Sequence, residues 1–215
     1  MSTFKKALLQ LHFFVFLAGL TGPLGFLIQL NGLMLVFYRM LLASIVLLLI
    51  YFFTQQKHHY NFTTKFKLIG IGAIIALHWV CFYGSIKLAN VSIALVCFSS
   101  TSMFTSLIEP LAKKIKIKWH DLFIGALSFL GILLIFHFDT KFRTGIIVGL
   151  FSALLASIFS VINKGVTNKV DTFTIQFYEM MGGVFFLTLV ILGSVGLNQN
   201  QFVLFLILFL RLIYQ

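Results

Sequence analysis

Acidic residues are scarce in this chain: it has 5 Asp and Glu among 215 residues, and charged residues of both signs make up only 10%. Soluble globular domains carry about 25% charged residues, so this composition excludes a soluble globular protein. Cysteine and proline are also rare, with two of each. Cys81 and Cys97 both lie in apolar runs without partner ligands, so neither a disulfide nor a metal site is indicated.

Several signatures of catalysis are missing as well. The sequence has no GxxxxGK[ST] phosphate-binding loop, which argues against direct ATP hydrolysis. The last full apolar run, 173–196, contains no lysine to link retinal, which argues against a photoreceptor. No grouping of His, Cys and carboxylates suggests a membrane-embedded enzyme. We therefore expect neither enzymatic activity nor a cofactor.

Long apolar runs are abundant, and hydrophobic residues make up 60% of the chain. A transmembrane helix needs about 20 mostly apolar residues. Runs of this length lie at 8–28, 33–53, 68–87, 91–111, 120–138, 145–164 and 173–196, and a shorter eighth run covers 202–214. The sequence predicts an all-α integral membrane protein with these seven helices and a short eighth apolar run.

The basic residues predict the orientation of these helices. With a cytoplasmic N-terminus, the inner loops and ends hold Lys5, Lys6, Lys57, Lys65, Lys67, Lys113, Lys114, Lys116, Lys118, Lys164 and Lys169. The outer loops hold only Lys87, Lys141 and Arg143. Because positive charge concentrates on the inner side, we predict a multi-pass protein of the bacterial inner (plasma) membrane with its N-terminus in the cytoplasm. Basic residues in the loops beside the lipid bilayer thus account for the net charge of +11, and we expect no nucleic-acid partner.

A short motif occurs twice, as "FYRM" at 37–40 and as "FYEM" at 177–180. With 27 Phe, 6 Tyr and 6 Met in the chain, two chance occurrences are not expected. Both copies lie near the start of the second helix of a unit, if units begin at the first and sixth helices. An odd number of helices per unit inverts the second copy, and inverted repeats are typical of secondary transporters. We therefore divide the chain into a first five-helix repeat, 1–140, and a partial second repeat, 141–215.

Four further stretches carry a resemblance to a known family: "VFYRMLLASIVLLL", "SIKLANVSIALVCFSSTSMFTSLIEPL", "GALSFLGILLIF" and "GLFSALLASIFSVINKGV". Their order and spacing resemble EamA-type permeases of the drug/metabolite transporter superfamily. The resemblance implies ten helices in an inverted five-plus-five repeat, of which this chain holds seven and the start of an eighth. It implies a multi-pass permease that moves a small organic metabolite, such as an amino acid or a drug, by secondary-active alternating access. The alternative is a truncated permease fragment that is inactive or depends on a partner, and a homodimer also stays open.

The third position of the motif carries opposite charges, Arg39 and Glu179, and Tyr38 and Tyr178 precede them. Each charge lies about six residues inside its helix, or about 9 Å below the membrane surface. A charge at this depth usually faces a cavity, a partner or a transport path. We expect these four residues to contribute to the substrate site, with a structural ion pair or snorkelling toward headgroups as the alternatives.

Three other candidates are His78, Trp79 and Asn163. His78 and Trp79 lie midway along the third helix, with Tyr83 further on, and could supply an aromatic wall with a polar group. A histidine hydrogen-bonded within the core and an interfacial Trp are the alternatives. Asn163 lies beyond a face of small residues on the sixth helix, formed by Gly149, Ala153 and Ser157 with Ser152, Ala156 and Ser160 in the next row. We expect that face to pack against another helix.

Two more features have both a structural and a functional reading. Ser99, Ser102 and Ser106 share one face of the fourth helix. Packing of that face against another helix is the favoured reading and a polar path the alternative. Pro23 with its flanking glycines interrupts the first helix, either as a simple kink or as half of a binding-site signal.

Overall fold

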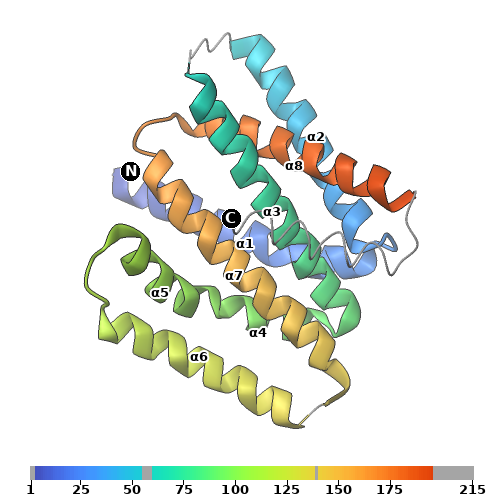
Figure 1. The fold of residues 1–215 in the computed structure, drawn as a ribbon, viewed down its shortest axis with the longest axis vertical. Coiled ribbons are helices and arrows are strands. Elements are labelled where there is room, and N and C mark those ends of the chain that lie inside the picture. The colour runs from blue at the N-terminus through green and yellow to red at the C-terminus, as the bar shows by residue number, and fades with distance from the viewer. Residues whose placement is uncertain (1–2, 55–59, 139, 196–215) are drawn as a thin grey trace.

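The computed structural model describes residues 3–54, 60–138 and 140–195, which form helices joined by short connections (Figure 1). The α-helices are α1 (Thr3–Leu27), α2 (Gly32–Thr54), α3 (Phe62–Leu88), α4 (Val91–Ser99), α5 (Thr101–Lys113), α6 (Trp119–Phe138), α7 (Arg143–Val166) and α8 (Thr172–Val195), and a 3₁₀ turn, η1 (Thr140–Phe142), precedes α7. No strand occurs within these ranges. The predicted all-α class is confirmed for the described residues.

Six stretches of these helices are long and apolar enough to cross a membrane: Phe4–Leu27, Gly32–Phe53, Phe62–Leu88, Val91–Lys113, Arg143–Val166 and Thr172–Gly193. In a bilayer a helix satisfies all its backbone hydrogen bonds within itself, which is why these apolar runs become helices. The predicted run 120–138 forms α6 but is not one of the six. The predicted eighth run, 202–214, lies outside the described residues.

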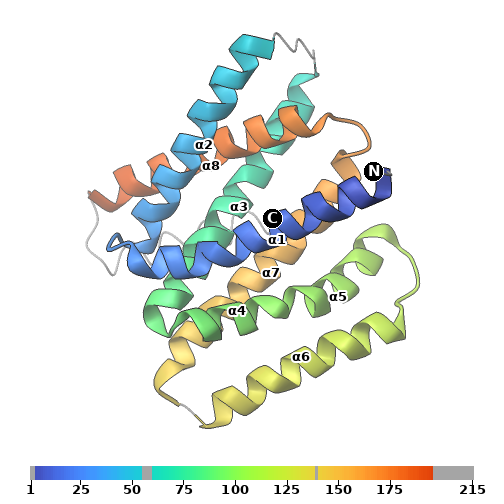
Figure 2. The same cartoon turned by 180° about the vertical axis from the view of Figure 1, so that it is seen from behind.

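Helix α3 lies at the centre of the bundle and packs most closely against α7 and α8. Helix α2 lies at one edge and α6 at the opposite edge in both views (Figures 1 and 2). Of the apolar window of α3, 56% is buried, against 6% for α1, which crosses one face of the bundle. The two helices that follow α6 in the chain are therefore part of the same packed core as α2 and α3.

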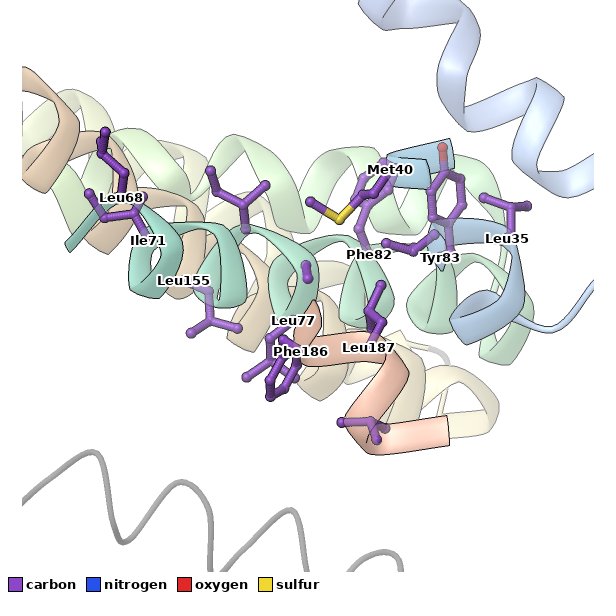
Figure 3. Packing of buried hydrophobic residues seen from close by; sticks show 14 of the residues in the cluster. Leu35, Met40, Leu68, Ile71, Leu77, Phe82, Tyr83, Leu155, Phe186 and Leu187 are labelled. Carbon is purple, nitrogen blue, oxygen red and sulfur yellow. The ribbon is translucent and has the colours of Figure 1, made fainter. Parts of the chain in front are cut away.

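The buried core gathers around α3 (Figure 3). Its labelled members are Leu68, Ile71, Leu77, Phe82 and Tyr83 of α3, Leu35 and Met40 of α2, Leu155 of α7, and Phe186 and Leu187 of α8. Since lipid tails are as apolar as these side chains, their association depends on tight van der Waals packing rather than on escape from water.

Glycines allow α8 to approach α3 closely. A Cβ on Gly72 would overlap the carbonyl oxygen of Glu179, and a Cβ on Gly182 would overlap the carbonyl oxygen of Ile69. By contrast, a Cβ on Gly70 would meet no atom within 4 Å. The crossing of α3 and α8 is thus fixed by glycine contacts on one side of α3.

The small-residue face of α7 packs as predicted along most of its length. Gly149, Ser152, Ala153, Ala156 and Ser157 are buried. At Gly149, a Cβ would crowd Ser85 Oγ of α3 and Cys97 Cβ of α4. Ser160 is the member for which the prediction was wrong, since it is exposed.

The predicted single helix 91–111 is divided into α4 and α5 at Ser100. Ser99, Thr101 and Ser102 donate their hydroxyls to carbonyls three residues earlier, at 2.6 to 3.0 Å. Such bonds compete with the backbone ladder of an α-helix and bend or interrupt it. Helix α1, in contrast, runs without a break through Pro23.

Candidate functional site

Arg39 of α2 lies against an aromatic wall on the C-terminal half of α3. Its Cζ is 3.8 Å from the centroid of the Trp79 ring. Its Nη1 donates a hydrogen bond of 2.9 Å to the hydroxyl of Tyr83. The rings of Trp79 and Tyr83 are stacked, with centroids 5.8 Å apart and an interplanar angle of 25°. The guanidinium is thus held in one orientation by a cation–π contact and a hydrogen bond.

Helix α1 closes this wall from the other side. A Cβ on Gly25 would overlap the Tyr83 ring, so α1 touches that ring only because residue 25 is glycine. Lys87 Nζ donates to the carbonyls of Phe26 and Ile28, at 3.3 and 2.8 Å, and holds the end of α1 against α3. The glycines around Pro23 therefore serve packing at the edge of the site.

Glu179 of α8 lies elsewhere along α3. It is 1% exposed, and its backbone crosses α3 at Gly72. The Asn163 side chain of α7 lies within hydrogen-bonding reach of its carboxyl group. Yet Asn163 Oδ1 and Glu179 Oε1 are both buried without a hydrogen-bond partner among the described residues. Glu179 and Asn163, predicted separately, are brought together.

Arg39 and Glu179 do not form an ion pair, since the salt bridges of the described residues involve neither. Arg39 contacts α3 at Trp79, and Glu179 contacts it at Gly72. These two positions are seven residues apart on α3, or about 10 Å along its axis. Each charge is the eighth residue of its helix, counted from Gly32 and from Thr172. The two charges occupy equivalent positions in α2 and α8 but lie on opposite halves of α3.

His78 has a structural role in this conformation. It is 2% exposed, and its Nδ1 lies 2.9 Å from both the carbonyl oxygen and the hydroxyl of Ser152 on α7. The Ser152 hydroxyl is also 3.0 Å from the carbonyl oxygen of His78, to which it can donate. Four rings surround the imidazole, those of Trp79, Phe82, Phe98 and Phe159. His78 therefore joins α3 to α7 and is buried in this conformation.

A polar hollow of about 430 Å³ lies where α5, the start of α6 and the end of α7 meet. It is lined by Thr101, Ser102, Thr105, Ser106, Glu109, Pro110, Ile115, Lys116, Lys118, Asp121 and Lys164. Glu109 pairs with Lys113 of its own helix at 2.7 Å and with Lys164 of α7. Thr105 Oγ1 and Ser157 Oγ are 2.9 Å apart and link α5 to α7 a turn further in. The hollow is therefore closed on one side by a polar contact between α5 and α7.

No group of three or more His, Cys, Asp and Glu residues that could hold a metal ion occurs in the part of the chain that the structure describes. The comparison with known families gives one match. A sequence model of the EamA-like transporter family matches residues 5–137, which is more than half of the chain and covers the whole of α2 to α5 with nearly all of α1 and α6. The chain belongs to the EamA-like transporter family. No curated protein and no solved structure matches it.

Membership of the EamA-like family makes the chain a multi-pass membrane transporter of the drug/metabolite type, with a small-molecule solute and a lipid environment. The resemblance expected from the sequence is confirmed. Arg39, His78 and Trp79 lie inside the matched range, whereas Asn163 and Glu179 lie beyond it. The roles of these residues in the EamA-like transporter stay predictions.

Tyr38 and Tyr178 do not join the groups described above. Tyr38 is 50% exposed, and its ring contacts that of its neighbour Phe37. Tyr178 lies under Lys65 Nζ, 5.7 Å from its ring centroid, at the N-terminal half of α3. Both tyrosines stay predicted site residues without a contact to Arg39 or to its aromatic wall among those of the described residues.

The polar hollow was not selected from the sequence. Its available signal was the shared face of Ser99, Ser102 and Ser106, for which packing was the favoured reading. Ser102 and Ser106 line the hollow, so the alternative of a polar path fits them better, whereas Ser99 is exposed outside it. The pairing of Glu109 with Lys164, 55 residues apart, had no signal in the sequence.

Proposed function

We propose that this EamA-like transporter carries a small organic solute with an anionic group, such as a carboxylate, and that Arg39 binds that group. The observation that carries the proposal is the Arg39 guanidinium, which lies over the Trp79 ring and donates to the Tyr83 hydroxyl. One of the five N–H donors of Arg39 forms a hydrogen bond to Tyr83. No acidic residue of the described chain forms a salt bridge with Arg39. A planar guanidinium with free donors matches a carboxylate, which accepts two parallel hydrogen bonds.

The free-energy cost of placing Arg39 in the membrane favours a role in binding a ligand over a purely structural role. Placing an arginine in a transmembrane helix costs about 2.5–3.5 kcal/mol near the bilayer centre. A cation–π contact recovers about 0.5–2 kcal/mol. The remaining cost is smaller if the solute's anionic group neutralises the guanidinium during each transport cycle. The aromatic wall then positions the arginine, and the solute completes its coordination.

The transport mode proposed is secondary-active alternating access. Helices α1 and α7 begin at residues 3 and 143, and α2 and α8 at 32 and 172, so both pairs are separated by the same interval as the two Phe-Tyr-x-Met motifs. This spacing supports an inverted repeat, in which one unit rocks against the other around a site near the midplane. With the N-terminus in the cytoplasm of a bacterial cell, Arg39 lies toward the outer side and Glu179 toward the inner side.

The polar hollow completes this path on the inner side. Its hydroxyls from α5 and its two carboxylates and three lysines suit a hydrated solute that enters or leaves between α5 and α7. The Glu109–Lys164 pair spans that gap in the present conformation. We propose that the pair opens when α5 and α7 separate, which admits the solute to the inner side.

The test is a counterflow assay with the purified chain in proteoliposomes. Labelled carboxylate-bearing metabolites, including amino acids, are compared with neutral isosteres of the same size. Saturable exchange of a carboxylate solute and none of its amide isostere supports the proposal. Equal exchange of both would contradict the role of Arg39. Absence of all exchange by the chain alone would favour the partner-dependent or inactive alternative.

A further inference from the structure

Two buried acceptor oxygens lie on neighbouring helices and have no hydrogen-bond partner among the described residues, Glu179 Oε1 on α8 and Asn163 Oδ1 on α7. Their side chains are within hydrogen-bonding reach of each other. Glu179 is nearly inaccessible, at 1% exposure, and its backbone is pressed against Gly72 of α3. Few buried polar atoms in native proteins lack a hydrogen bond, so two such atoms close together indicate a bound proton or ligand.

Among the described residues, a charged carboxylate at this position would also lack a counter-ion. The ionisable groups on the packed helices are Arg39, Tyr38 and Tyr51 of α2, Lys65, Lys67, His78, Cys81, Tyr83 and Lys87 of α3, Arg143 and Lys164 of α7, and Tyr178 of α8 itself. Arg39 is held by Trp79 and Tyr83, His78 by Ser152, and Lys164 by Glu109. None of the cations forms a salt bridge with Glu179. A buried carboxylate without a paired cation is strongly unfavourable.

One added proton resolves both unpaired oxygens. A neutral carboxyl group has one O–H donor, whereas a carboxylate can only accept, and the amide oxygen of Asn163 can only accept as well. We propose that Glu179 is a proton-binding site in which the neutral acid donates its O–H to Asn163 Oδ1, while the amide N–H of Asn163 donates to the other carboxyl oxygen. The proton comes from water and adds to a carboxylate oxygen, and it returns to water when the carboxylate re-forms. No other bond is made or broken.

The position of Glu179 and Asn163 on two different helices allows proton binding to be coupled to helix movement during transport. Asn163 lies on α7 and Glu179 on α8, where Glu179 contacts α3 at Gly72, while Arg39 contacts the other half of α3 at Trp79. A movement of α7 or α8 against α3 separates the amide from the acid and exposes the acid to water, where it ionises. Glu179 then couples proton movement to solute movement, a role that rests on the proposed function above. The proton site itself does not rest on that function.

Infrared difference spectroscopy tests the proton site without any transport. The chain has only 5 acidic residues, so the carbonyl stretch of a protonated carboxyl group is readily assigned. We expect the wild-type protein at neutral pH to show this band, and Glu179→Gln, which keeps the side-chain shape, to lose it. Asp121→Asn, which changes an exposed carboxylate, should leave it unchanged. Absence of the band from the wild type, or its persistence in Glu179→Gln, would overturn the proton site.

Asn163→Leu tests the hydrogen bond. Loss of the amide acceptor should shift the band to higher frequency, as for a carboxyl group that no longer donates, and an unshifted band would overturn the pairing with Asn163. Both variants are checked for a monodisperse folded protein beforehand, and Glu179→Gln is expected to be at least as heat-stable as the wild type. A clear loss of thermal stability in Glu179→Gln would argue for a charged, paired Glu179.

Coupling is tested separately in proteoliposomes. We expect an imposed proton gradient to raise net solute uptake by the wild type at least severalfold, whereas uptake by Glu179→Gln should no longer respond to the gradient. A wild type that exchanges solute but ignores the gradient would overturn the coupling role. A chain that shows the carboxyl band but no solute exchange at all would instead contradict the proposed function.

Discussion

The guanidinium of Arg39 lies over the indole ring of Trp79, with the Arg39 Cζ 3.8 Å from the ring centroid. This contact joins α2 to α3 within the apolar part of the chain. It gives a partly buried cation a fixed orientation, because the Trp79 ring covers one face of the guanidinium and Tyr83 accepts a hydrogen bond from Nη1.

Truncation of Trp79 should weaken solute binding rather than stop folding. Loss of the cation–π contact in Trp79→Leu costs about 0.5–2 kcal/mol, which corresponds to an increase in the apparent KM for uptake of about twofold to thirtyfold. Tyr51→Phe, also on α2, is the control, since Tyr51 is 40% exposed and its ring contacts those of Phe52 and Phe177. An unchanged KM in Trp79→Leu would mean that the aromatic wall does not position the arginine.

Gly72→Ala should destabilise the crossing of α3 and α8. Its added Cβ would overlap the carbonyl oxygen of Glu179, and overpacking of this kind costs about 1–3 kcal/mol. Thermal unfolding in detergent measures the loss. Gly70→Ala is a matched control on the same helix, because a Cβ there meets nothing within 4 Å. Equal Tm values for the two variants would contradict the close approach of α8 to Gly72.

His78→Leu should lower stability and leave the apparent KM unchanged. The substitution removes the imidazole contact to Ser152, while the Ser152 hydroxyl keeps the carbonyl oxygen of residue 78 as its acceptor. Interhelical hydrogen bonds in membranes contribute about 0.6 kcal/mol on average and up to about 1.7 kcal/mol. The Tm and the uptake kinetics are measured on the same preparation. A raised KM at unchanged Tm would place His78 in the solute site instead.

Charge reversal at the inner end tests the contact between α5 and α7. Lys164→Glu brings a second carboxylate next to Glu109 and should slow uptake, while the Glu109→Lys/Lys164→Glu double variant should recover much of the rate. The effect on the free energy of unfolding should be small, because the Lys164 side chain is 60% exposed and solvent screens the pair. Lys114→Glu, exposed just beyond α5, is the control. A double variant as slow as the single one would exclude the pair from the path.

The sequence predicted the helices well because membrane helices are set by the length of apolar runs. It also placed Arg39 and Glu179 near the starts of their helices, and each is the eighth residue of its helix. The break at Ser100 was missed, because hydropathy does not register hydroxyls that compete for backbone carbonyls. The partners of Arg39, His78 and Glu109 could not be predicted, because they depend on how each helix is rotated against helices distant in the chain.

The most direct test of the account is solute uptake by Arg39 variants in proteoliposomes. We predict that Arg39→Gln loses saturable uptake of the carboxylate solute by at least about tenfold, a cost of about 1.4 kcal/mol or more. Arg39→Lys should lose much of it as well, because an ammonium group cannot form the paired hydrogen bonds of a guanidinium. Arg143→Gln, which removes an exposed positive charge at the start of α7, should transport as the wild type does. Uptake by Arg39→Gln with the wild-type KM and rate would contradict the assignment of Arg39 to the solute site.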